Sequence, residues 1–491
     1  MLTFKIEATV EDTSKTKLQG LSDIALVYLD SGWTVVVASA ADSALTTFEF
    51  TGGLVGDVID TQAFTSASGT QTVWNMTFAA LGDTVALVPA TRYEDQAVVY
   101  EMTEVGDFAP TAGAGGMVGF GLTHSVEVDG TVFVFAGGSG VTSYTLGGGF
   151  ALTKGATFAD TAARHLGDIS AFANVTIGAN DYLFAASAFD AGVSSFKIKS
   201  NGALSLVDEI EPGDFSGFSR VQALTTLTVE GSDFLVMASA GTSSLTTYKI
   251  NAAGELSETD HLIDTLDTRF QNATLIESFE FDGRSFIVAA GSDDGISVLE
   301  ISASGALSDM GSLADTYDIA LDNISGLAVE VIAGAVVILV SSETDHGFTQ
   351  ITLDMSRLAA AIKGSAGDDT LKGTRDEDVI NGMDGDDVID GHSGDDLIID
   401  GAGSDVLIGG GGADVFQFVE DGTVDELADL RPNNDMIDLS GFAGVNRMSD
   451  IDVMDWCDGV MIIVNNDVIL VRDYTNVEFT VDTFDASNFI F

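Results

Sequence analysis

An aspartate recurs every nine residues between positions 364 and 417. Six consecutive nonapeptides fill this segment, and the sixth position of each copy is always aspartate. These aspartates are Asp369, Asp378, Asp387, Asp396, Asp405 and Asp414. Regularly spaced carboxylates favour a hard cation held by oxygen atoms. The whole chain has one cysteine and five scattered histidines, which argues against a zinc site.

The remaining positions predict how the aspartates are held. Position eight is always a large apolar residue, namely Leu371, Ile380, Ile389, Ile398, Leu407 and Phe416. We expect it to point inward from a very short strand, after a glycine-rich turn whose carbonyls face outward. If two nonapeptides form one coil, turns 18 residues apart stack. Carboxylates and carbonyls of stacked turns would then form about four Ca²⁺ sites, pairing Asp369 with Asp387, Asp378 with Asp396, Asp387 with Asp405, and Asp396 with Asp414.

Two copies depart from the pattern. Asp376 and Asp400 stand where glycine is usual, so these turns either bind more weakly or use the extra carboxylate. The segment carries 14 acidic and 2 basic residues, and its turns would repel one another without a cation. We therefore expect its folding to be coupled to metal binding, with Mg²⁺ less suited than Ca²⁺ to turns that supply many carbonyls.

The nonapeptides resemble the RTX (repeats-in-toxin, hemolysin-type) calcium-binding repeats, in which Gly-Gly-x-Gly-x-Asp-x-apolar-x recurs. The resemblance covers residues 364–417 and implies a parallel β-roll with Ca²⁺ in its turns. The segment at residues 418–491 resembles the flank that closes such a roll. Its end, Asp485-Ala-Ser-Asn-Phe-Ile-Phe491, resembles the uncleaved signal of proteins exported by type I secretion.

Composition is consistent with cations as partners. The formal charge is −57, whereas 45% of the residues are hydrophobic, so the chain can bury a large core and is not a disordered acidic protein. A field of this sign repels phosphate backbones, so nucleic acid is not an expected partner. The N-terminus has no apolar signal region. The most apolar stretch, Gly326 to Val340, is broken by Glu330 and Gly334, which favours two buried strands over a transmembrane segment.

Residues 1–355 repeat with a longer period. Aligned second strands place a large side chain at Phe48, Tyr100, Tyr144, Phe196, Tyr248, Leu299 and Ile351, with spacings of 44 to 52 residues. Strand-only repeats of this length predict a seven-bladed β-propeller. The seventh copy stops at its third strand, and Leu2 to Val10 would supply the fourth and close the ring. The alternative is a pair of β-sandwiches. The expected fold is thus all-β: the propeller, the β-roll and a small β-rich C-terminal segment.

The same alignment predicts a ring of polar residues at the entries of the inner strands. These candidate ligand-binding residues are Asp23, Trp74, His124, Asp168, Arg220, Asn272 and Ser325. A water-filled channel would need polar walls in any case. Alternatively, His124, Asp168 and Arg220 could form an acid/base pair with an anion clamp.

Blades four to six also resemble lactonase-like propellers, in segments such as Leu245-Thr-Thr-Tyr-Lys-Ile-Asn-Ala-Ala-Gly-Glu-Leu256. That family's Pro-Arg signature is half present, as Ser219-Arg220, so the resemblance implies the fold and no catalytic residue. There is no His-Glu-x-x-His and no Gly-x-Ser-x-Gly, which excludes the zinc proteases and lipases that use those motifs.

Two functions remain open. The first is a secreted calcium-binding protein, extracellular or attached to the cell surface, that is exported by a type I secretion apparatus. Its propeller would bind a glycan or protein and act in adhesion or in surface or matrix assembly. The alternative is a secreted hydrolase with its site at the propeller mouth. The sequence favours the binding protein.

Overall fold

The computed structural model describes residues 2–490 except 64–72, 74, 91–98, 111–120, 139, 162–165, 191, 212–216, 267, 317–318, 357, 359–361, 433, 440, 443, 446, 457–458, 473–479, 481–483 and 485–487. The described residues form β-strands and one short 3-10 helix, η1 (Met448–Asp450). No helix among them has the length and apolar character needed to span a membrane. The chain forms two compact units. The first contains Met1–Phe281 and Ser285–Asp354, and the second contains Asp282–Arg284 and Met355–Phe491.

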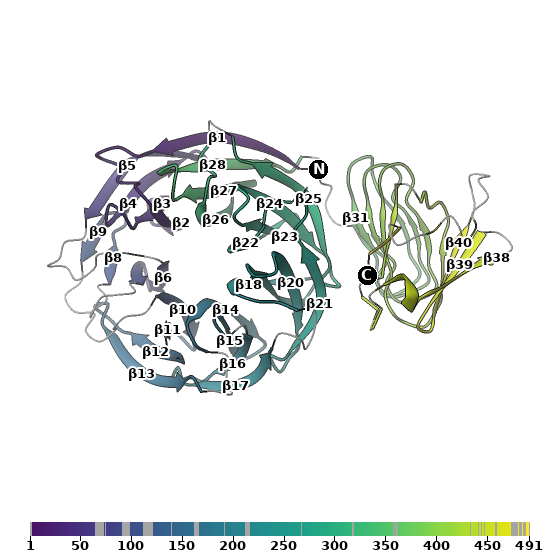
Figure 1. The fold of residues 1–491 in the computed structure, drawn as a ribbon, viewed down its shortest axis with the longest axis horizontal. Coiled ribbons are helices and arrows are strands. Elements are labelled where there is room, and N and C mark those ends of the chain that lie inside the picture. Colours follow the sequence, from purple (N-terminus) through teal and green to yellow (C-terminus); the bar gives the residue numbers. More distant parts are fainter. Residues whose placement is uncertain are drawn as a thin grey trace. The chain divides into compact units, whose positions relative to one another are not determined.

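The first unit is a seven-bladed β-propeller, as the 52-residue repeat predicts (Figure 1). Each blade is a four-stranded antiparallel sheet. From the inner strand outward, the first three blades are β2 (Leu21–Leu29), β3 (Gly32–Ser39), β4 (Ala44–Thr51) and β5 (Leu54–Ala63); β6 (Asn75–Leu81), β7 (Thr84–Ala90), β8 (Tyr100–Met102) and β9 (Phe108–Pro110); β10 (Leu122–Val128), β11 (Thr131–Gly138), β12 (Gly140–Leu146) and β13 (Leu152–Ala159).

The next three blades follow the same order. They are β14 (Ile169–Ile177), β15 (Asn180–Ser187), β16 (Gly192–Ile198) and β17 (Leu204–Ile210); β18 (Val221–Val229), β19 (Ser232–Ser239), β20 (Ser244–Ile250) and β21 (Leu256–Ile263); β22 (Leu275–Phe281), β23 (Arg284–Ala290), β24 (Gly295–Ile301) and β25 (Leu307–Ala314).

The seventh blade joins both ends of the propeller sequence. It consists of β26 (Ile324–Ile332), β27 (Ala335–Ser342), β28 (Gly347–Asp354) and β1 (Thr3–Glu11). β1 pairs antiparallel with β28, from Thr3 opposite Asp354 to Glu11 opposite Gly347. The apolar stretch that starts at Gly326 is thus the hairpin of β26 and β27.

The propeller core lies between neighbouring blades. Both faces of the second strand of each blade are covered, so the centre of this strand is apolar; every residue of β23 is buried. Between the fourth and fifth blades, Tyr182 and Phe184 belong to the same buried cluster as Met237 and Tyr248. Burial of each such side chain contributes about 1.5–3 kcal/mol to the stability of the fold.

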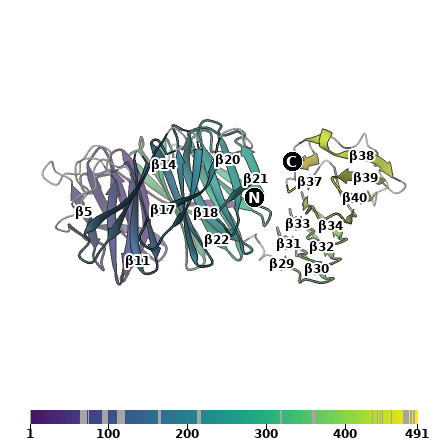
Figure 2. The ribbon, with the colours of Figure 1, turned by 90° about the horizontal axis from the view of Figure 1, so that it is seen from below.

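The second unit is a parallel β-roll, as the nonapeptides predict, and its short strands are stacked in Figure 2. One sheet has the order β29 (Ile362–Lys363), β31 (Val379–Asn381), β33 (Leu397–Ile399), β35 (Val415–Gln417), β37 (Met436–Asp438) and β41 (Phe489–Ile490). The other has β30 (Thr370–Lys372), β32 (Val388–Asp390), β34 (Val406–Ile408), β36 (Val424–Leu427), β40 (Asp467–Arg472), β39 (Gly459–Val464) and β38 (Asp452–Trp456).

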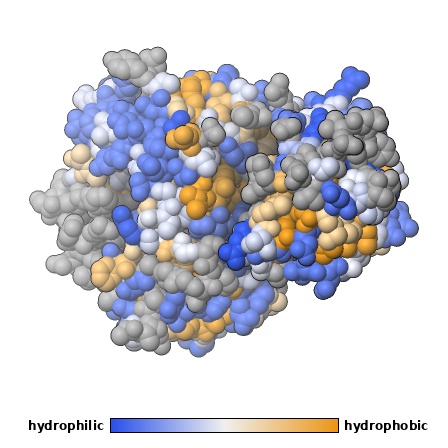
Figure 3. All heavy atoms as spheres, turned by 45° about the vertical axis from the view of Figure 1, so that its right-hand side comes forward, coloured by the Kyte–Doolittle hydropathy of each residue, from blue (hydrophilic) through white to orange (hydrophobic). Residues whose placement is uncertain are grey.

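Position eight of the nonapeptides forms the interior of the roll. Ile380, Ile389, Ile398, Leu407 and Phe416 are all 0% exposed, and Leu371, in the first coil, is half-buried against them. The β-rich C-terminal segment continues both sheets, and its apolar side chains belong to the same cluster. Much of the surface seen in Figure 3 is hydrophilic, in keeping with the charge of −57.

Candidate calcium centre

The position-six aspartates form two rows along the roll. In each row the backbone N–H of one aspartate donates to Oδ1 of the aspartate one coil further on. One row runs through Asp369, Asp387, Asp405 and Asp425, with distances of 2.7, 2.7 and 3.1 Å. The other runs through Asp378, Asp396, Asp414 and Asp435, with distances of 2.9, 3.1 and 3.2 Å. The four pairs expected from an 18-residue coil are therefore neighbours.

The second carboxylate oxygen is the chemically important one. Oδ2 of Asp387, Asp396 and Asp405 is buried and has no hydrogen-bond partner among the described residues, and the same holds for Oδ1 of Asp378. A buried carboxylate oxygen without a partner costs free energy unless a cation neutralises it. These atoms are therefore suited to coordinate metal ions held between successive coils of the same row.

Glycine at position one leaves room beside these oxygens. A Cβ added at Gly382 would collide with Asp387 Oδ2, and one added at Gly391 would collide with Asp396 Oδ2. At position four the backbone of Gly385 and Gly394 has φ of +123° and +138°, which glycine adopts without strain. The turn sequence thus keeps the space and the backbone shape that an ion site needs.

Four of the nonapeptide aspartates hold their protons more tightly than usual when no cation is present. Burial, more than the neighbouring carboxylates, raises the pKa of Asp396 to about 7 and of Asp405 and Asp414 to about 6. Burial also raises the pKa of Asp387. Asp369, at the open end of its row, differs because hydrogen bonds from Ser365 lower its pKa. Bound cations would favour the ionised form at every interior position.

The family comparison agrees with this geometry. The model of the RTX calcium-binding nonapeptide repeat, four copies long, matches residues 363–398 and 391–417. These residues are RTX repeats. Ca²⁺ fits the donor set, because buried carboxylate oxygens and turn carbonyls supply only hard oxygen ligands. The match is confined to this segment of the chain.

Two further comparisons concern the whole chain. No curated protein matches it. The crystal structure of a protein from Lactobacillus plantarum is similar at 14% sequence identity and a TM-score of 0.47, over 64% of this chain and 88% of that one.

Sequence reasoning missed the last aspartate of each RTX row. Asp425 follows Asp405 by 20 residues and Asp435 follows Asp414 by 21, so neither keeps the period of 18. The signal that could have found them is the apolar residue two positions later, Leu427 and Ile437, which corresponds to position eight of a nonapeptide and is 0% exposed.

The structure brings together two of the seven propeller residues expected at the channel mouth. Asp23 and His124 both line a central cavity of about 350 Å³. His124 Nε2 lies 2.7 Å from Asn174 Oδ1, and burial lowers the pKa of the imidazole. Glu277, which the repeat alignment did not predict, lines the same cavity.

The other predicted ring residues lie elsewhere. Asp168, Arg220 and Asn272 are exposed turn residues with φ of 54°, 55° and 49°, before the inner strands begin. Ser325 is the bulged residue of β26 and is hydrogen-bonded to Ser341, and Trp74 lies outside the described residues. His124, Asp168 and Arg220 therefore do not share the cavity lining.

A difference in register explains these placements. The inner strands shift register at Leu21/Asp23, Ile169/Ala171 and Val221/Ala223, so the counterparts of Asp23 are alanines. The repeat alignment instead matched Asp23 with Asp168 and Arg220, which lie three positions before these alanines. Both residues have a left-handed backbone conformation in the turn before the inner strand.

Proposed function

We propose that this chain is a secreted calcium-binding protein whose RTX roll folds on Ca²⁺ and whose propeller binds a ligand outside the cell. The observation that carries the calcium function is the row of buried, unpartnered aspartate oxygens on RTX repeats. Folding that brings these oxygens together releases free energy only when ions bind among them. Millimolar Ca²⁺ outside the cell suits the weak affinity of extracellular calcium modules.

A calcium titration followed by circular dichroism tests this function. We expect the full-length chain to gain β signal as Ca²⁺ is added, and Mg²⁺ to be a poor substitute. Asp396→Asn should raise the Ca²⁺ concentration at the midpoint about tenfold, because one ligand charge is lost from a shared site. Asp390→Asn is the matched control, since Asp390 pairs with Lys372 on the outside of the roll. If the circular dichroism spectrum of the wild-type chain does not change when Ca²⁺ is added, the proposed calcium function is refuted.

Export through a type I apparatus is part of the proposal and rests on the resemblance of the C-terminal segment. Because that segment also completes the sheets of the roll, deleting it would disturb folding as well as export. Fusion of residues 355–491 to an unrelated passenger avoids this problem. We expect cells with a type I transporter to export the fusion, and to retain the same passenger joined to residues 1–354. Retention of both fusions would argue against this route.

The propeller is proposed to act in adhesion or in surface or matrix assembly through a glycan or protein ligand. The alternative is a lactonase-like hydrolase. It is supported by the cavity lined by Asp23, His124 and Asn174, whose polar side chains could contact a substrate. His124→Ala tested on esters, lactones and glycans separates the two, with Arg220→Ala as the control outside the cavity. Turnover lost only in His124→Ala would support the hydrolase, whereas binding without turnover would support the adhesion module.

A further inference from the structure

The two RTX rows end differently where the repeats meet the C-terminal segment. In the row that ends at Asp435, the Arg431 guanidinium occupies the last position. Its Nη2 donates to Asp414 Oδ2 at 3.0 Å, to Asp435 Oδ1 at 3.2 Å and to the carbonyl oxygen of Gly412 at 2.7 Å. Two carboxylates and one turn carbonyl are the kinds of ligand that a calcium ion would take there. This end of the row therefore already carries its own cation.

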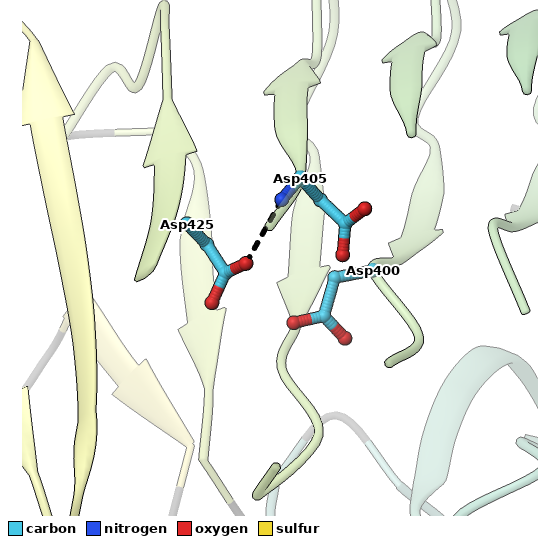
Figure 4. Close-up of side chains that lie close together, drawn as sticks. All are labelled: Asp400, Asp405 and Asp425. Atoms are coloured by element: carbon cyan, nitrogen blue, oxygen red, sulfur yellow. Dashed lines mark hydrogen bonds between the residues drawn. The ribbon is translucent and has the colours of Figure 1, made fainter. Parts of the chain in front are cut away.

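The equivalent place in the other row has three carboxylates instead. Asp400, Asp405 and Asp425 each offer an oxygen, and these oxygens lie within 4.8 Å of one another (Figure 4). Their residues are 1%, 1% and 2% exposed, so the charges lie in the interior. Asp405 Oδ2 is buried and without a hydrogen-bond partner, whereas the corresponding atom of Asp414 is bonded to Arg431.

Asp400 is what makes this place unusual. The other five nonapeptides begin with glycine, so position one adds no charge in them. Asp400 Oδ1 accepts hydrogen bonds from the backbone N–H groups of Gly401 and Val419, which fix the carboxylate beside Asp405. A third buried carboxylate raises the cost of leaving the cluster without a cation and strengthens the binding of one.

We propose that Asp400, Asp405 and Asp425 hold a divalent cation at the C-terminal end of their row, and that Arg431 takes the place of that cation in the other row. The inference rests on the proposed calcium function and adds two ligands outside the nonapeptide pattern. With three carboxylates, the site should bind Ca²⁺ more tightly than the interior positions. The roll would then be tied to its C-terminal segment by one bound ion and one arginine.

Calcium binding to the full-length chain, measured by isothermal titration and by counting ions after equilibrium dialysis, tests the site. Asp400→Asn should weaken the tightest binding step about tenfold or more. Asp390→Asn should leave that step unchanged, because its carboxylate pairs with Lys372. If Asp400→Asn binds as many ions with the same affinities as wild type, the site is refuted.

Arg431→Gln tests the equivalence of the two row ends. Loss of the guanidinium should let one more calcium ion bind per chain, between Asp414 and Asp435. Arg447→Gln is the control, since Arg447 pairs only with Asp450 among the described residues. An unchanged ion count, or a variant that stays unfolded in saturating Ca²⁺, would show that calcium cannot replace the guanidinium. If the wild-type chain binds no Ca²⁺, the proposed function is refuted. If the wild-type chain binds Ca²⁺ and both Asp400→Asn and Arg431→Gln bind it with the same affinities and ion count, only this inference is refuted.

Discussion

Two carboxylic acids in the propeller channel have unusually high pKa values. Burial raises the pKa of Asp23 to about 7. Burial, followed by the charges of Asp23 and Glu330, raises the pKa of Glu277 to about 8. In the unfolded chain these groups return to ordinary acid values of 3.8 and 4.5. A group that holds its proton more tightly in the folded state stabilises the fold only while it is protonated.

The propeller should therefore become less stable as the pH rises. The stabilising contribution of the two groups is complete below about pH 4 and is lost as the pH passes through about 7 to 8. We expect the melting temperature of the propeller to fall between about pH 4 and about pH 8, and Glu277→Gln to reduce this fall. The side chain of Glu277 is exposed to the channel, where water screens its charge, so Asp23→Asn should reduce the fall in melting temperature more than Glu277→Gln does.

Glu280→Gln is the control for this experiment, because Glu280 lies on the same strand, β22, and does not line the channel cavity. Calorimetry at several pH values measures the effect. An identical pH dependence in wild type and in both channel variants would exclude Asp23 and Glu277 as its source.

At the scale of the strand and turn, the sequence predicted the roll more completely than the propeller channel. A nine-residue period fixes both the inward residue and the aspartate, so strands β30 to β35 and both rows follow from it. The turns of the C-terminal segment are longer, so Asp425 and Asp435 do not follow the preceding aspartates at the 18-residue spacing, and a search for that period does not find them. In the propeller, a bulge shifts the inner strands β2, β14, β18 and β26 by one residue but not β6 or β10, and spacing alone cannot reveal this difference.

The inward position of the roll strands gives a prediction for packing. Ile398 in β33 is 0% exposed and lies in the core that the repeats share with the C-terminal segment. Ile398→Ala should lower the free energy of unfolding of the calcium-bound roll by about 2–5 kcal/mol, because it leaves a cavity. Val388→Ala in β32 is the control, since Val388 occupies position seven and is 40% exposed. Denaturant unfolding in saturating Ca²⁺ measures both, and equal losses would contradict the inward role of position eight.

At the scale of the molecule, acidic residues serve two different purposes. Of the charge of −57, the 54 residues of the nonapeptides carry 14 acids and 2 bases, a net −12. Aspartates in the rows face one another in the interior, where they need a cation. In the propeller the clusters between the blades are apolar, and Glu300 is the only almost fully buried acidic side chain among the described residues of this unit. Calcium dependence should thus be confined to one of the two units.

Removal of calcium should therefore unfold one unit and leave the other. In saturating Ca²⁺ we expect the full-length chain to show separate melting transitions for the propeller and the RTX roll. A chelator should abolish the roll transition, because its folding free energy includes that of ion binding, and added Ca²⁺ should restore it. The propeller transition should persist at the same temperature, since its inter-blade core does not depend on the ions. Loss of both transitions on chelation, or survival of both, would contradict this division.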